Sequence, residues 1–292
     1  MKFGRIKEWR QQYPICLMCR VLDVSESGYY AWLNRPVSLR KQANERLELE
    51  IQAAHQRTRG TYGPERLQRD LADNGTHLGI DRIKRIRRKL GLRCLQKRKF
   101  KATTDSRHSL PVAPNLLKRN FKVSEPNKAW VSDITYIPTN EGWLYLAGIK
   151  DLFSGELVGY ALHERMTKNL VMQAVFRAVS GRKIDKGLIL HSDRGSQYCA
   201  HEYQALLTQF GMQASMSRKG DCWDNAPMES FWGSLKNELV HHRQYRNRAD
   251  AKQEISEYIE IFYNRQRKQA RLGYLSPVAF TQQFYIQKLN AA

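Results

Sequence analysis

The stretch that decides the fold is Trp130-Val131-Ser132-Asp133-Ile134-Thr135-Tyr136. Aromatic and β-branched residues surround a single carboxylate, so the stretch predicts a largely buried strand that carries Asp133. A buried carboxylate without a partner destabilises a fold, and a bound cation removes that penalty. Asp133 is therefore the first candidate for a metal-binding residue.

Two more acids stand at comparable places further along the chain. Asp193 follows a short apolar strand predicted at 187–191, and Glu229 opens a helix predicted at about 226–239. Individually, Asp193 suits a turn and Glu229 suits a first helical turn. Together with Asp133 they form a set of carboxylates that would repel one another unless divalent cations bound, and such cations drive phosphoryl transfer.

The charge distribution indicates a nucleic-acid partner. The 292-residue chain has a formal net charge of +21. Residues 1–120 contain 27 Lys and Arg against 11 Asp and Glu, whereas the remainder contains 22 against 17. A basic front half predicts DNA binding that weakens steeply with salt, although a generally adhesive basic protein has a similar composition.

Composition also argues against several classes of protein. The chain has no apolar run of about 18 residues and no apolar leader, so we expect a cytoplasmic protein with no membrane partner. Five cysteines are typical of a reducing compartment rather than a disulfide framework. Cys16 and Cys19 have the spacing of zinc ligands, but His55, His77 and Cys94 do not supply a matching second pair. No structural zinc is expected.

The front of the chain predicts helices, and the back predicts strands alternating with helices. The expected divisions are a helix-turn-helix-like region at 1–40, a helical basic region at 41–100, a linker at 101–121, a catalytic core at 122–240 and a C-terminal helical segment at 241–292. Within the last segment, 250–285 predicts a helix. The order of elements in the core predicts an α/β layered domain.

Basic residues concentrate in a predicted helix at 80–90, with six in positions 82–89. So many charges of one sign exceed what helix stability needs, which favours DNA contact over a merely solvated face. A Gly-containing basic loop at 217–221 is also expected near DNA. The predicted DNA-binding residues in these two places are Arg82, Lys84, Arg85, Arg88, Arg218 and Lys219.

Several other residues are assigned structural roles. Asn225 is expected to cap the helix that carries Glu229. Trp223 and Trp232 are expected in the core, as are Cys16 and Cys19, which lie on an apolar helix.

Four segments together resemble bacterial insertion-sequence transposases. They are 130–136, His191-Ser192-Asp193-Arg194-Gly195-Ser196-Gln197-Tyr198, 224–238 and Tyr263-Asn264-Arg265. The resemblance is to the group whose transposase is split over two overlapping reading frames, and specifically to the second-frame (OrfB-type) product with its retroviral-integrase-like DDE core. It covers nearly the whole chain.

The resemblance implies a fold and a site. The fold is a ribonuclease-H-like core, with a mixed five-stranded sheet and helices, preceded by an all-α helix-turn-helix DNA-binding region. Asp133, Asp193 and Glu229 would be catalytic and hold a pair of Mg²⁺ ions, for which Mn²⁺ can substitute. Lys236, which shares a helix face with Glu229 two turns earlier, would contact transposon-end DNA.

The implied function is DNA transposition, in which metal-dependent cleavage at 3′ ends is followed by strand transfer, integration and recombination. Double-stranded DNA would be the partner, both as transposon ends and as target, with a homo-oligomer assembling on it. A first-frame product would act as a partner or fusion, in the bacterial cytoplasm at the nucleoid. Two other classes stay open: a ribonuclease-H-like nuclease that only hydrolyses, and a DNA-binding regulator.

Overall fold

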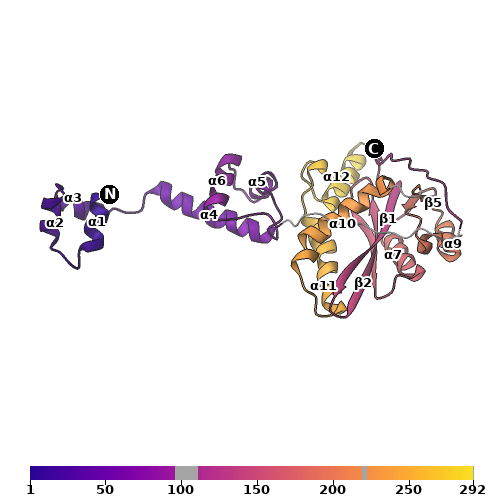
Figure 1. Ribbon diagram of the computed structural model, residues 1–292. Helices are drawn as coiled ribbons and strands as arrows, with labels where there is room; N and C mark the ends of the chain where they lie inside the picture. The colour runs from indigo at the N-terminus through magenta and orange to yellow at the C-terminus, as the bar shows by residue number, and fades with distance from the viewer. Residues whose placement is uncertain (96–110, 219–221, 292) are drawn as a thin grey trace. The chain divides into compact units, whose positions relative to one another are not determined.

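The structure, a computed structural model, describes residues 1–95, 111–218 and 222–291. It divides into two compact units, Met1–Ala53 and Ala54–Ala292. Helix α4 (Leu39–Arg57) runs across the division, so the boundary falls inside this helix rather than in a loop (Figure 1).

The first unit is helical and comprises α1 (Lys2–Trp9), α2 (Ile15–Val21), α3 (Glu26–Leu33) and most of α4. Ser25 caps α3, because its Oγ accepts a hydrogen bond from the Gly28 backbone N–H at 3.0 Å. Cys19 packs in the small core with Ile6 and Tyr29. Cys16 is exposed, so the prediction that both cysteines lie in the core is wrong for Cys16. Only one side of the short helix α2 packs against the core, and Cys16 lies on the other side.

The second unit begins with the end of α4 and a basic helical pair, α5 (Pro64–Asp73) and α6 (Ile80–Lys89). Leu67 and Leu71 of α5 are buried, as are Ile83 and Ile86 of α6. The hydrophobic stripe of α6 therefore faces inward, which leaves the opposite side of this helix to Lys84, Arg85, Arg88 and Lys89, whereas Arg87 is buried.

A mixed five-stranded sheet forms the centre of the second unit, as predicted. Its order is β3-β2-β1-β4-β5. The first three strands pair antiparallel, whereas β4 pairs in parallel with both β1 and β5. The strands are β1 (Ala129–Thr139), β2 (Gly142–Asp151), β3 (Leu157–His163), β4 (Ile189–Ser192) and β5 (Gln213–Met216).

Helices cover both faces of this sheet (Figure 1). Ala147 and Ile149 of β2 belong to a core with α7 (Lys168–Ser180) and α9 (His201–Gln209). Gly148, between them in sequence, faces Met228 and Trp232 of α10 (Ala226–Glu238). Because successive strand residues point to opposite faces, α7 and α10 lie on opposite sides of the sheet.

The helical tail predicted for 250–285 is divided, because the π-helix ends at Gln266 and α12 begins only at Pro277. Gly273 has a positive φ of 63°, and Ser276 starts a new helix by accepting a hydrogen bond from the Ala279 N–H. No helix in the described ranges is long and apolar enough to cross a membrane. The remaining helical elements are α8 (Ser196–Cys199), α11 (Arg248–Glu257), α12 (Pro277–Asn290), a π-helix (Tyr258–Gln266) and 3₁₀ turns at Cys222–Asn225, Val240–His242 and Ala270–Leu272.

Gly159 allows β3 to approach α7 closely. A Cβ at this position would lie 2.6 Å from Ala178 Cβ and 2.7 Å from Ala178 N, and it would also collide with the Ala174 carbonyl. We predict that Gly159→Ala lowers the free energy of unfolding by about 1–3 kcal/mol, because strand or helix must shift.

The measurement is the urea midpoint of the full chain. Gly181→Ala is the matched control, since a Cβ at Gly181 meets nothing within 4 Å, and its effect should stay within about 0.5 kcal/mol. Equal midpoints for the two variants would show that the close approach does not constrain the fold.

Candidate active site

Asp133 lies in the middle of β1, with both carboxylate oxygens held by hydrogen bonds. The Ile134 backbone N–H donates to Oδ1 at 2.8 Å, and the Trp232 indole N–H donates to Oδ2 at 3.0 Å. The residue is only partly exposed. Its carboxylate therefore has a defined orientation before any ligand arrives.

The parallel pairing of β1 with β4 places Asp193 near Asp133. Val131 is the register partner of His191, and each acid lies two residues further along its own chain. Burial raises the pKa of Asp133, and the negative charge of Asp193 raises it further. Asp193 Oδ1 also accepts a hydrogen bond from the Gly195 N–H at 2.9 Å, the Asx-type turn that suits an Asp after a strand.

Glu229 lies in the first turn of α10 and is exposed. Its charge also raises the pKa of Asp133, but less than burial and Asp193 do. Across the described ranges, no group of three or more His, Cys, Asp or Glu side chains is close enough to enclose a metal ion. The structure therefore brings Asp133 and Asp193 together and places Glu229 at the edge of the site.

Lys236 lies on the same helix as Glu229 but is buried, only 6% exposed. Its ammonium is 4.9 Å from the centre of the Tyr136 ring, within the range of a cation–π interaction. Burial lowers the pKa of Lys236 to about 8, while the charge of Asp133 acts in the opposite direction. Lys236 thus lies against the strand that carries Asp133.

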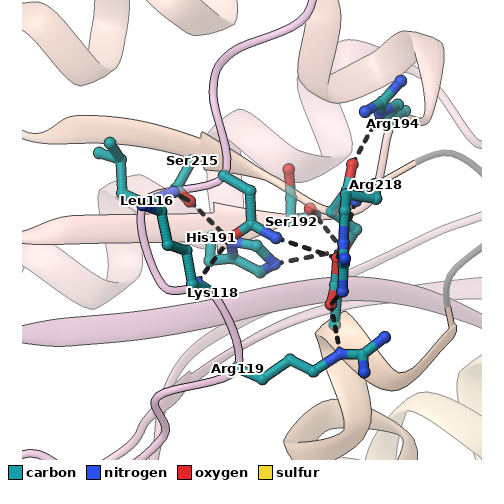
Figure 2. A network of polar contacts seen from close by, with 11 residues as sticks. Leu116, Lys118, Arg119, His191, Ser192, Arg194, Ser215 and Arg218 are labelled. Atoms are coloured by element: carbon teal, nitrogen blue, oxygen red, sulfur yellow. Dashed lines mark hydrogen bonds and ion pairs between the residues drawn. The ribbon is translucent and has the colours of Figure 1, made fainter.

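A polar network centred on Asp224 connects three segments of the core, and Figure 2 labels Arg119 and Arg218 among its members. The buried Asp224 carboxylate accepts hydrogen bonds from Asn115 Nδ2 at 2.9 Å and Arg119 Nε at 2.8 Å. It also accepts from the backbone N–H, Nε and Nη2 of Arg218. The network joins residues 115–119, the chain after β5 and the turn that starts α10.

His191 supports the same region from inside the sheet. Its two ring nitrogens contact the hydroxyls of Ser215 and Ser217 at 2.8 and 3.2 Å (Figure 2). Burial lowers the pKa of His191 to about 4. A neutral imidazole therefore links the ends of β4 and β5, two residues before Asp193 in the sequence.

The predicted DNA-contact residues lie in separate places. Lys84, Arg85 and Arg88 are exposed on α6, and Arg82 is partly exposed. Arg218 is exposed, although its guanidinium also bonds Asp224. Lys219 lies outside the described residues.

Two expectations about the neighbours of these acids need correction. Trp223 is 69% exposed, so its assignment to the core is wrong, whereas Trp232 is buried as predicted. Asn225 occupies the N-cap position, but within the described chain its side chain forms no capping bond. Its Nδ2 donates instead to the Ser132 carbonyl at 3.1 Å. The role of Trp232 carries no sequence signal, because its acceptor Asp133 is 99 residues away; Asp224 likewise has partners at Asn115 and Arg119 that the local sequence does not indicate.

Comparison with known proteins identifies the family. Residues 123–222 and 229–284 match the family model "Integrase core domain", and residues 41–100 match "HTH-like domain". The transposase InsF of insertion sequence IS3A from Escherichia coli (strain K12) is 40% identical over 282 residues, covering 96% of this chain and 98% of the relative. The chain belongs to the IS3 family of transposases.

Two further matches accompany this one. An uncharacterized 31 kDa protein of insertion element IS600 from Shigella sonnei is 58% identical over 268 residues, covering 92% of this chain and 98% of the relative. Among solved structures, the HTLV-2 integrase catalytic core domain in complex with magnesium has 16% identity and a TM-score of 0.44, covering 55% of this chain and 99% of that one.

The family confirms the predicted class of activity. The chain is a transposase with a DDE polynucleotidyl-transferase core, it functions in DNA transposition, and it binds DNA. The integrase core implies dependence on a divalent metal. The donor set suits such an ion: carboxylate oxygens are the ligands that hard divalent cations prefer, and a cation would offset the repulsion that raises the pKa of Asp133.

The Asp224 network should stabilise the transposase in a pH-dependent way. Burial raises the pKa of Asp224, but the hydrogen bonds and charges of Arg218 and Arg119 outweigh burial and hold it well below its usual range. Because the folded-state pKa is lower than the unfolded one, the stabilisation is complete above about pH 4 and declines as the pH falls toward the folded value.

We predict that Asp224→Asn lowers the free energy of unfolding by about 1–3 kcal/mol at pH 7. The difference from the unmodified chain should shrink below about pH 4. Thermal unfolding across that pH range measures it. Glu254→Gln, which breaks a half-exposed pair with Arg243, is the control and should have little effect. A penalty for Asp224→Asn that stays constant with pH contradicts the electrostatic role.

Proposed function

We propose that Asp133, Asp193 and Glu229 are the metal-binding acids of this transposase and that they hold a pair of Mg²⁺ ions. The main support is that Asp133 and Asp193 each lie two residues beyond the Val131–His191 register pair of the adjacent parallel strands β1 and β4, and that burial and the charge of Asp193 both raise the pKa of Asp133. Such a pair of carboxylates needs a compensating positive charge. Glu229 stands at the edge of the pair on an exposed helical turn, where it can complete the ligand set as DNA and metal bind.

Each residue then has a part in cleavage and strand transfer. Bound divalent ions supply Lewis-acid activation and charge neutralisation for in-line displacement at phosphorus. Asp133 and Asp193 would hold these ions, and Glu229 would add a ligand from α10. In cleavage, a water oxygen bonds to phosphorus at the transposon end, and the bond from phosphorus to the 3′ oxygen breaks. In strand transfer, the freed 3′-hydroxyl bonds to a target phosphorus and displaces the target's own 3′ oxygen.

The DNA is proposed to lie along basic side chains of both the helical region and the core. Arg82, Lys84, Arg85 and Arg88 would neutralise phosphates along α6, and Arg218 would do so beside the core. Lys236 would act near the acids, because its ammonium lies against β1. We further propose a homo-oligomer that holds both transposon ends, working with a first-frame product as partner or fusion.

Neutralising any one acid should abolish the chemistry and leave DNA binding intact. We predict that Asp133→Asn, Asp193→Asn and Glu229→Gln each lower Mg²⁺-dependent cleavage and strand transfer by roughly a thousandfold or more, because several kcal/mol of charge stabilisation is removed. A labelled transposon-end duplex reports both steps on one gel, which also separates a transposase from an enzyme that only hydrolyses.

Asp185→Asn is the matched control, since Asp185 is 74% exposed and pairs only loosely with Lys128 at 3.6 Å. It should behave like the unmodified chain. Near-normal activity in one of the three acid variants removes that acid from the site, and cleavage without joining in the unmodified chain favours the hydrolytic alternative.

The basic face of α6 should account for part of the salt dependence of DNA binding. We predict that Lys84→Ala, Arg85→Ala and Arg88→Ala combined weaken duplex binding and reduce the slope of log K against log[salt] by about 1 for each phosphate that the variant no longer neutralises. Fluorescence anisotropy of the full chain at several salt concentrations measures this slope. The control replaces Lys183, Lys186 and Lys252 by alanine, since these residues are also exposed but lie outside α6. Equal slopes for the two triple variants would show that α6 does not bind phosphates.

A further inference from the structure

The Trp232 side chain links the helix that carries Glu229 to the strand that carries Asp133. Its indole N–H donates to Asp133 Oδ2 at 3.0 Å. Trp232 follows Glu229 by three residues, so the two side chains share one side of α10. The indole is buried, with the residue only 6% exposed, and water competes little for this hydrogen bond.

Gly148 provides the space that the indole occupies. It is the register partner of Asp133 across the β1–β2 pair. A Cβ at Gly148 would lie only 2.9 Å from Cη2 of Trp232 and 3.3 Å from Cε of Met228. The residue opposite Asp133 therefore has no side chain, and the ring that fills that space is the one that bonds Asp133.

The two hydrogen bonds occupy only some of the acceptor positions of the Asp133 carboxylate. Each carboxylate oxygen has about two acceptor positions, and Ile134 N–H and Trp232 N–H take one on each oxygen. The remaining positions are those that a cation can use. A donor that bonds a metal ligand in this way fixes the ligand's orientation before the metal binds.

A second indole–carboxylate pair in the chain has a different setting. Trp130 Nε1 donates to Asp151 Oδ2 at 3.2 Å, and Asp151 also accepts backbone N–H groups from Asn127, Phe153 and Ser154. That carboxylate organises a turn and belongs to neither the Asp133–Asp193 pair nor α10. The Trp130–Asp151 pair therefore has the same indole–carboxylate hydrogen bond at a structural position, which makes it a matched control.

We propose that Trp232 is a positioning residue for the metal site: its N–H orients the Asp133 carboxylate and couples it to the helix of Glu229. This inference rests on the proposed metal role of the acids. Trp232→Phe, which keeps an aromatic ring but loses the N–H, should then weaken divalent-metal binding about 10–100-fold, the usual effect of removing a group that orients a metal ligand. Trp130→Phe loses the equivalent donor to Asp151 and should leave metal affinity unchanged, whatever it does to the melting temperature.

The experiment is titration of the full chain with Mn²⁺, with free Mn²⁺ followed by electron paramagnetic resonance and no catalysis required. Asp133→Asn is run beside the two tryptophan variants. Weak binding in both Asp133→Asn and Trp232→Phe, with normal binding in Trp130→Phe, supports the inference. Normal affinity in Trp232→Phe, or an equal loss in Trp130→Phe, overturns it. Normal affinity in Asp133→Asn instead overturns the proposed metal site itself.

A measurement on the unmodified chain covers the case in which Trp232→Phe does not fold. In ¹⁵N-tryptophan-labelled protein, the chain's six tryptophans give separate indole N–H resonances. Adding Mg²⁺ should shift the Trp232 resonance, because its acceptor becomes a metal ligand, and should leave the Trp130 resonance in place. A Trp232 resonance that stays fixed while Mg²⁺ binds contradicts the inference.

Discussion

The parallel pairing of β1 with β4 is the constraint on which the rest of the site depends. It brings together Asp133, in the middle of β1, and Asp193, just after β4, and burial and the charge of Asp193 raise the pKa of Asp133. A fold retains such an arrangement only where something supplies positive charge. The repulsion explains the rest of the site. It calls for a bound cation, which the hydrogen bonds to the acids and the helix with Glu229 are placed to support.

The surroundings of the pair are organised so that the acids stay in place without a ligand. His191 joins the ends of β4 and β5 as a neutral ring. Asp224 binds the start of α10 to the chain after β5 and to residues 115–119. Arginines within the protein neutralise this structural carboxylate, whereas the Asp133 carboxylate accepts hydrogen bonds from the neutral N–H groups of Ile134 and Trp232. This contrast separates an acid that holds the fold from an acid poised for a cation.

Strand periodicity and turn residues predicted the α/β layered domain, because they are short-range signals, and the resemblance carried by the local motifs implied the mixed sheet and the roles of the candidate acids. The sequence did not predict that Asn225 would bond the Ser132 carbonyl rather than cap α10, or that Trp223 would be exposed while Trp232 contacts Asp133. Those outcomes depend on which segments meet in the fold. The helical tail expected for 250–285 is divided for a local reason, since the backbone becomes extended at Arg267 and Ser276 caps a separate helix.

The central claim is that Asp133, Asp193 and Glu229 converge on divalent ions when DNA is bound. Anomalous diffraction from Mn²⁺-containing crystals of the full chain with a transposon-end duplex tests it most directly. The account predicts anomalous peaks beside Asp133 and Asp193, with Glu229 as a ligand and the scissile phosphate adjacent. Peaks held by other side chains, or a Glu229 carboxylate still remote from the metal in the DNA complex, would contradict it.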